Sequence, residues 1–204
     1  MGWYSRFVFP RICELGLNNR RVAAHRVELL SQAQGEILEI GIGSGLNVAH
    51  YPSHVRRIVA IDPNPGMHRW AEERIKASQL EVDKRVLKSE SLPFDAGTFD
   101  CVVSTFTLCS IDGIDQALSE IHRVLKPGGK FLFLEHGLSP DPGVARWQRR
   151  LNGLERLLAD NCHLDRDIRA IVSRQPFSSV EAESYYLEKT PKTHGYFSQG
   201  AAIK

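Results

Sequence analysis

Cysteine is scarce in this sequence, and its spacing matches no metal-binding pattern. The four cysteines are Cys13, Cys101, Cys109 and Cys162. No two of them have Cys-x-x-Cys spacing, so we expect no zinc site. A disulfide framework is not expected in a chain of 204 residues with this composition. Cysteine usage therefore predicts a protein of the reducing cytoplasm that binds no metal.

A strong excess of one charge and long apolar runs are also lacking. The formal net charge of +2 at pH 7 is too mild for the strongly basic face of a nucleic-acid-binding protein. No segment approaches the roughly 18 consecutive apolar residues of a membrane span. Arg6, Arg11 and Glu14 interrupt the N-terminal segment, so we expect no signal peptide. With 42% hydrophobic residues, the composition predicts a single globular domain with its own core.

Short β-rich runs alternate with longer segments of helical periodicity. The expected strands cover 36–40, 57–61, 82–87, 99–105, 130–135, 179–187 and 194–203. The expected helices cover 20–33, 66–78, 113–125, 143–158 and 165–174. This alternation predicts an α/β fold in which helices cover both faces of a mostly parallel sheet. The last two strands are expected to pair as an antiparallel hairpin, which makes the sheet mixed.

Two of the predicted helices have a clear apolar stripe. In helix 20–33 the stripe contains Val22, Ala23, Val27 and Leu30. In helix 143–158 the residues expected to point inward are Val144, Trp147, Leu151, Leu154 and Leu158. Both helices are therefore expected to pack these side chains against the sheet.

The strongest motif is the glycine-rich turn after the first strand. It reads Glu39-Ile40-Gly41-Ile42-Gly43-Ser44-Gly45. Glycine permits a tight turn and lets a ligand approach the backbone closely. Asp62 ends the second strand, where an acid can accept hydrogen bonds from both ribose hydroxyls of a nucleoside. A glycine-rich turn without a ligand is the alternative, but the glycines together with the acid favour a nucleoside site.

The glycine spacing favours S-adenosylmethionine (SAM) over NAD. A dinucleotide site requires Gly-x-Gly-x-x-Gly, and Leu46 occupies its third glycine position. The spacing here is Gly-x-Gly-x-Gly, preceded by Glu39. SAM carries an amino-acid group and no pyrophosphate, and a carboxylate can hold the ammonium of that group by charge-assisted hydrogen bonds.

Four segments of the sequence resemble a known family in order and spacing. They are EIGIGSG (39–45), AIDPNPGM (60–67), SLPFDAGTFDCVVSTFTL (91–108) and EIHRVLKPGGKFLFLEHG (120–137). Together they look like the class I SAM-dependent methyltransferases, and within them the ubiquinone-biosynthesis-like (methyltransferase type 11) group. The segments 161–166 and 195–202 look like a bacterial branch related to the animal methyltransferase-like thiol S-methyltransferases. Those animal proteins carry a hydrophobic N-terminal membrane segment, which we do not find in this sequence.

The resemblance implies a sheet of seven strands with the final antiparallel strand inserted near the edge. It also implies cofactor-binding roles for matching residues. Contacts to the methionine part and the loop backbone fall to Glu39, Gly41, Gly43, Gly45 and Thr105, the ribose contact to Asp62, and packing beside the adenine to Pro63 and Met67. Lys88 stands where relatives often have an Asp that contacts the adenine amine, so Ser89 or Glu90 is expected to replace that contact.

Candidates for acceptor binding follow strands four and five, because open α/β sheets bind ligands at the carboxyl ends of their strands. They are Thr107, Cys109, Glu135 and His136. We expect His136, with Glu135, to be catalytic, since a histidine of near-neutral pKa suits a general base; a structural, hydrogen-bonded histidine is the alternative. Arg166 is expected to bind an acidic acceptor or to hold Glu135, with a surface ion pair as the alternative. Cys162 and His163 are expected to be loop residues and not metal ligands.

The N-terminal segment is rich in aromatic residues, among them Trp3 and Tyr4. Such residues can fold over a SAM pocket as a lid and exclude water; packing of an ordinary helix is the alternative. We therefore expect one methyltransferase domain over 1–204. It is expected to contain an N-terminal helical lid (1–34), a SAM-binding core (35–137) and acceptor-side helices and strands (138–204).

Methyl transfer to a small molecule, possibly a thiol, is the function that the sequence favours. The product of SAM would be S-adenosylhomocysteine. Quinone C-methylation and lipid N-methylation are the alternative reactions, and a SAM-binding regulator without catalysis is the alternative class. We expect a small-molecule partner, no nucleic acid and no transmembrane segment, while the oligomeric state stays open.

Overall fold

The computed structural model describes residues 8–65 and 68–204. The helices are α2 (Phe9–Leu17), α3 (Arg20–Leu30), α4 (His68–Lys76), α5 (Ile114–Val124), α6 (Pro142–Leu158) and α7 (Ile168–Ser173), with a 3-10 turn η1 (Val48–His50). The strands are β1 (Ile37–Ile40), β2 (Arg57–Ile61), β3 (Glu81–Arg85), β4 (Phe99–Thr105), β5 (Leu125–His136), β6 (Ser179–Tyr186) and β7 (Tyr196–Ile203). Each expected strand and helix is present, with its ends moved by a few residues.

The strands form one sheet in the order β3-β2-β1-β4-β5-β7-β6. Strands β1 to β5 run parallel, and β7 pairs antiparallel with both β5 and β6. The predicted α/β fold and the inserted C-terminal hairpin are therefore confirmed. The order reverses direction between β1 and β4, so the loops that follow these two strands diverge and leave a crevice at the carboxyl edge of the sheet.

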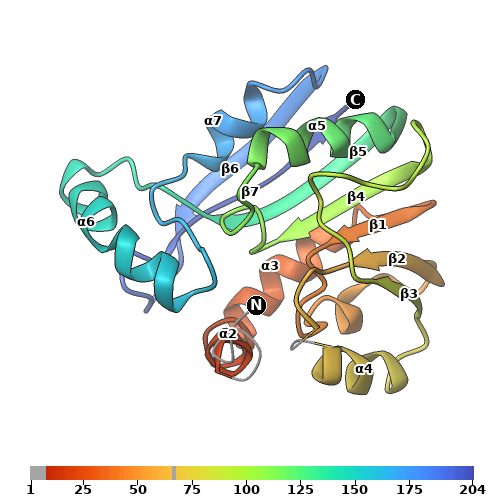
Figure 1. Ribbon diagram of the computed structural model, residues 1–204, viewed down its shortest axis with the longest axis horizontal. Helices are drawn as coiled ribbons and strands as arrows, with labels where there is room; N and C mark the ends of the chain where they lie inside the picture. Colours follow the sequence, from red (N-terminus) through yellow and green to blue (C-terminus); the bar gives the residue numbers. More distant parts are fainter. Residues whose placement is uncertain (1–7, 66–67) are drawn as a thin grey trace.

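Helices cover both faces of the sheet (Figure 1). On one face, Leu118 of α5 and Val172 of α7 pack with Phe131 and Phe133 of β5. On the other, α3 packs its buried side chains against β1, β4 and β5. Residues Val102 and Val103 are both fully buried, because adjacent positions of β4 point to opposite faces. The sheet is thus buried on both sides, as expected for parallel strands.

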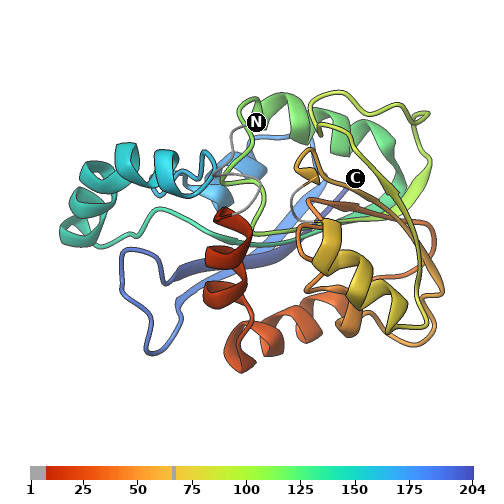
Figure 2. The same ribbon diagram turned by 60° about the horizontal axis from the view of Figure 1, so that its bottom comes forward.

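The prediction for helix 143–158 was wrong about which side chains it buries. Trp147 is 56% exposed and Leu154 also 56%, and α6 extends beyond the end of the sheet (Figure 2). Only Ala145 and Gln148 of α6 are buried among the described residues. Gln148 donates to the carbonyls of Gly137 and Thr193 and accepts from Ser139 N. A buried amide therefore anchors this helix where an apolar stripe was expected.

The apolar stripe of α3 is also rotated from the predicted one. Its buried residues are Val22, Arg26, Leu29 and Leu30, whereas Val27 is 50% exposed.

Strand β5 begins at Leu125 and includes the Lys126–Gly129 turn, earlier than the predicted start at 130. Among residues 8–65 and 68–204, every helix is too short or too polar to cross a membrane.

Close packing of the C-terminal hairpin generates the first prediction. A Cβ at Gly200 in β7 would lie 2.3 Å from the Glu181 carbonyl oxygen and 2.7 Å from Ala182 Cα, so Gly200→Ala must push β6 and β7 apart. We expect the midpoint of thermal unfolding to fall by roughly 3–10 °C, from about 1–3 kcal/mol of overpacking. Gly153→Ala in exposed α6, where nothing lies within 4 Å, should be neutral or stabilising. Equal melting temperatures for the two variants would contradict this packing.

Candidate active site

A cavity of about 320 Å³ opens at the carboxyl edge of the sheet, beside the switch point between β1 and β4. This volume lies in the range of small-molecule sites. The predicted cofactor and acceptor residues that line it are Glu39, Gly41, Gly43, Asp62, Pro63, Ser89, Glu90, Thr105 and Thr107. The structure thus brings together residues from four separate segments that were predicted one by one from the sequence.

The glycine turn after β1 forms the floor of this cavity. Gly41 has a φ of +74°, and a Cβ there would lie 2.1 Å from Thr107 Oγ1, so both its backbone conformation and its neighbour require glycine. Gly45 has a φ of +80° and lies against the backbone of Ala71 in α4. Gly45 does not line the cavity. Its absent side chain instead lets α4 approach the turn closely.

Glu39, at the end of β1, is buried yet reaches the cavity wall. Asn47 Nδ2 donates to its Oε1 at 2.9 Å, and the Tyr51 hydroxyl donates to its Oε2 at 2.9 Å. Burial raises the pKa of Glu39 to about 7, although hydrogen bonds from Tyr51 and Asn47 act in the opposite direction. A buried carboxylate in this state gains stability from any cation that enters the cavity.

Arg26 is the functional candidate that the sequence analysis missed. It lies on α3, is 4% exposed and lines the cavity, and its Nη1 donates to Asn47 and to Thr105 Oγ1. Its Nε is buried without a hydrogen-bond partner among the described residues. The missed signal was a charged residue on the buried stripe of a helix, four positions after Val22. Buried arginines are rare unless they bind something.

Asp62 follows β2 and binds the glycine turn directly. Its Oδ2 accepts from Gly43 N at 2.8 Å and its Oδ1 from Asn64 N at 2.7 Å. Burial raises the pKa of Asp62 to about 6, against the two backbone hydrogen bonds that lower it. Each carboxylate oxygen has a further lone pair, so Asp62 keeps capacity for two hydroxyl donors.

The segment after β3 forms the opposite wall. Ser89 and Glu90, the expected substitutes for the adenine contact, both line the cavity together with Lys88. The Ser89 hydroxyl donates weakly to Glu90 at 3.4 Å, and Glu90 Oε1 accepts from Gly113 N at 3.5 Å. Pro63, the chain neighbour of Asp62, also lines the cavity. Met67 lies outside the described residues.

The mouth of the cavity is built from α2 and from the loop after α6. Cys13 and Leu17 of α2 line it, as do Asp160 and Asn161. An ion pair between Glu14 and Arg74 ties α2 to α4. Trp3 and Tyr4, the predicted aromatic lid, lie outside the described residues. A lid role for the N-terminal segment, which includes α2, stays a prediction.

Glu135, predicted to be catalytic, is fully buried and does not line the cavity. Its Oε1 accepts from Ser104 Oγ at 3.0 Å, Thr107 N at 2.9 Å and Leu108 N at 3.0 Å. Burial, followed by the nearby charge of Cys109, raises the pKa of Glu135 to about 8. In the structure it therefore holds the turn after β4; a catalytic role for it stays a prediction.

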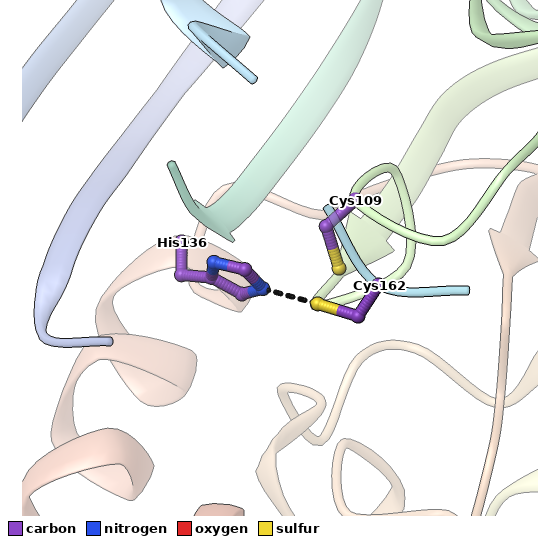
Figure 3. A group of neighbouring side chains, drawn as sticks. All are labelled: Cys109, His136 and Cys162. Atoms are coloured by element: carbon purple, nitrogen blue, oxygen red, sulfur yellow. Dashed lines mark hydrogen bonds between the residues drawn. The ribbon is translucent and has the colours of Figure 1, made fainter. Parts of the chain in front are cut away.

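His136 and Cys109 form a cluster with a third residue, Cys162 (Figure 3). Ser110 and Asn161, which are chain neighbours of the two cysteines, line the cavity. His136 Nε2 lies 2.8 Å from Cys162 Sγ. Burial lowers the pKa of His136, but the charge of Cys109 and a hydrogen bond to Cys109 raise it by more. The pKa of His136 therefore lies above its ordinary value. The hydrogen bond from Cys162 places the pKa of Cys109 well below its usual range. The predicted base role of His136 is untested, and its side chain does not line the cavity.

Arg166 contacts backbone and not Glu135. Its Nη1 donates to the carbonyls of Leu108 at 2.6 Å and Cys109 at 2.9 Å. The expected pairing with Glu135 is therefore wrong, because the guanidinium bridges the loop after β4 to the segment before α7. Arg166 does not line the cavity.

Comparison with known proteins identifies the family. The family model described as "Methyltransferase domain" matches residues 38–133. The human thiol S-methyltransferase TMT1A is 32% identical over 177 residues, which cover 81% of this chain and 72% of that protein. The rat thiol S-methyltransferase TMT1B is also 32% identical, over 151 residues, but the chain spans only 62% of its length. A phosphatidylethanolamine N-methyltransferase from Cereibacter sphaeroides is 29% identical over 86% of this chain and 83% of its own.

Solved structures share the fold. An N-methyltransferase from Haemonchus contortus, in complex with phosphomonomethylethanolamine and S-adenosylhomocysteine, superimposes with a TM-score of 0.73. It is 18% identical, and the match covers 98% of this chain and 58% of that one. This chain combines the sheet order and the glycine turn with 32% identity to a methyltransferase over most of its length. The protein therefore belongs to the class I SAM-dependent methyltransferases.

Proposed function

We propose that this chain binds SAM in the cavity described above and methylates a small thiol. The observation that carries the proposal is the 32% identity to the human thiol S-methyltransferase over 81% of the chain. When bound, SAM supplies a methyl group on a positively charged sulfur. The task of the chain is then to bind and align the two reactants and to exclude water.

The polar groups of the cavity fit the parts of SAM. Glu39 offers carboxylate oxygens to the ammonium, and Asp62 keeps acceptor capacity for the ribose hydroxyls. Arg26 has a buried Nε without a partner among the described residues, so we assign it to the ligand carboxylate. Glu39 and Arg26 thus offer a negative and a positive charge in the same cavity, as the zwitterionic amino-acid group of SAM requires.

The acceptor end of the cavity suits a neutral nucleophile. Its wall contains the uncharged residues Phe106, Thr107, Ser110 and Ile111, and the acids Asp112 and Asp160 line the cavity beside them, which disfavours an anionic acceptor. A thiol of pKa about 8.5 is only a few per cent ionised at neutral pH, but its thiolate is a strong nucleophile. Alignment in a water-poor cavity is therefore the main requirement, and a base contributes a further factor of about 10²–10⁴ at most. A base role for His136 stays a prediction, and it requires that the ring nitrogen Nε2 binds no metal ion.

The raised pKa values of Glu39 and Asp62 predict that ligand affinity depends on pH. Lowering the pH protonates Glu39 first, with a pKa of about 7, and then Asp62, with a pKa of about 6. Each proton removes a charge that holds the ligand, so affinity for S-adenosylhomocysteine should fall by up to about tenfold per pH unit per group. Calorimetric titrations between about pH 8 and pH 5.5 measure this fall.

Glu39→Gln is the matched control for this dependence. It should bind the ligand weakly at every pH, and its affinity should change little above about pH 6.5, where only Glu39 titrates in the wild type. Asp62→Asn should keep the loss of affinity near pH 7, which comes from Glu39, and should lack the further loss near pH 6. A wild-type affinity that is constant over the whole range would show that neither carboxylate contacts the ligand.

The acceptor class is tested with labelled SAM and a panel of thiols, phenols, quinols and phosphatidylethanolamine. We expect methylated thiols as the main products, identified by mass, and no product with Asp62→Ala. Methylation of a quinol or of the lipid headgroup, without any thiol product, would replace the thiol proposal with one of the two alternative reactions. The SAM-binding proposal would survive that result.

The position of α2 at the cavity mouth generates a prediction about the N-terminal lid. Removal of residues 1–17 deletes Cys13, Leu17 and the Glu14–Arg74 ion pair, but leaves the described sheet and its two cores intact. Turnover should therefore fall more than tenfold while the melting temperature changes by only a few degrees. Full activity in the truncated protein, measured at saturating SAM, would contradict a lid role.

A further inference from the structure

Three side chains from distant segments, Cys109, His136 and Cys162, lie together in the structure (Figure 3). Cys109 follows β4, His136 ends β5, and Cys162 lies in the loop after α6. One potential ligand atom of each lies within 4.8 Å of the other two. The spacing along the chain gives no hint of this, because the fold alone brings the three segments together.

We propose that Cys109, His136 and Cys162 bind one Zn²⁺ ion. Two thiolates and an imidazole are a ligand set that zinc prefers, and tetrahedral zinc places such atoms about 3.5–3.8 Å apart. In the cluster, His136 Nε2 and Cys162 Sγ are 2.8 Å apart, which is closer than this spacing, and all three ligand atoms lie within 4.8 Å of one another. Small side-chain rotations therefore suffice to enclose an ion.

Charge and burial both suit a zinc ion. Cys109 is 2% exposed and Cys162 is 7% exposed, so an unpaired charge here would be costly. Two thiolates and one Zn²⁺ sum to zero, which removes that cost.

The backbone around the cluster is held in place. The Cys109 carbonyl accepts from His163 N at 3.0 Å and from Arg166 at 2.9 Å, and Cys162 N donates to the Ala159 carbonyl. A site whose ligands are already positioned loses little conformational entropy on binding. This also gives Arg166 a role, because it positions the loop that carries Cys109.

Three protein ligands leave one position of a tetrahedral ion open, as in catalytic zinc sites. Ser110 and Asn161, the chain neighbours of Cys109 and Cys162, line the cavity. Water or a soft group of the acceptor would complete the coordination. Binding of the ion itself does not depend on the thiol proposal, and the following test has no enzymatic readout.

The test is zinc retention by the full chain without a histidine tag. The reduced protein is treated with a chelator, dialysed, titrated with Zn²⁺ against a chromophoric chelator, and analysed for metal by mass spectrometry. We expect one Zn²⁺ per chain and a melting temperature that rises with Zn²⁺ but not with Mg²⁺. With Co²⁺ in place of Zn²⁺, near-ultraviolet thiolate-to-cobalt absorption should report the two sulfur ligands.

Cys109→Ala and Cys162→Ala should bind zinc at least about 100-fold more weakly, because loss of a ligand costs more than loss of an outer partner. Cys101→Ala is the matched control, since Cys101 is an equally buried free cysteine in β4 outside the cluster. The control should retain one ion. A wild-type chain that binds no Zn²⁺ in the titration, or cluster variants that bind it as tightly as the wild type, would overturn the proposal, and this holds whether or not any thiol is methylated.

Discussion

The buried hydrogen-bond network around Glu39 is the interaction on which the rest of the site depends. It joins the end of β1 to Asn47 and Tyr51 beyond the glycine turn, and through Asn47 to Arg26 of α3 and Thr105 of β4. The network therefore links α3, the glycine turn and the end of β4 around the switch point. A charged carboxylate without such partners would be too costly to bury. Its raised pKa shows that the network offsets only part of this cost.

Glu135, a second buried acidic residue, holds the turn after β4 in place. Glu135 of β5 accepts two backbone N–H groups from the turn after β4, and this turn carries Thr107 toward the glycine turn. Arg166 binds carbonyls of the same turn from the other side. Two ionisable side chains, Glu135 and Arg166, thus hold the loop that separates the cofactor cavity from the cysteine–histidine cluster. Both the cavity and the cluster depend on how rigidly this loop is held.

Most of the fold and the cofactor side of the site could be predicted from sequence. Strand alternation, the glycine spacing and Asp62 are local signals, so a single segment is enough to recognise each of them. The prediction of which α6 side chains are buried was wrong. Apolar periodicity shows which side chains share a face of a helix, but not whether another part of the protein covers that face. Arg26 was missed because its contacts lie on other elements, although its place on an otherwise apolar stripe was a usable signal.

Cys109 and His136 were predicted from the sequence to lie at the same edge of the sheet, but the sequence could not predict that Cys162 joins them in a cluster. Its members become neighbours only because parallel strands β4 and β5 end at the same edge and the loop after α6 returns there. Contacts of this kind depend on tertiary structure, and pairwise spacing along the chain carries no trace of them. The same is true of Thr107, whose approach to Gly41 explains that glycine better than the turn itself does.

The central claim is that the charged network at the end of β1 is the amino-acid end of a SAM site. A crystal structure of the protein with S-adenosylhomocysteine tests it most directly. The account predicts the ligand ammonium within hydrogen-bond distance of Glu39, its carboxylate on Arg26 and its ribose hydroxyls on Asp62. A ligand bound in the reverse direction, or bound outside this cavity, would contradict it.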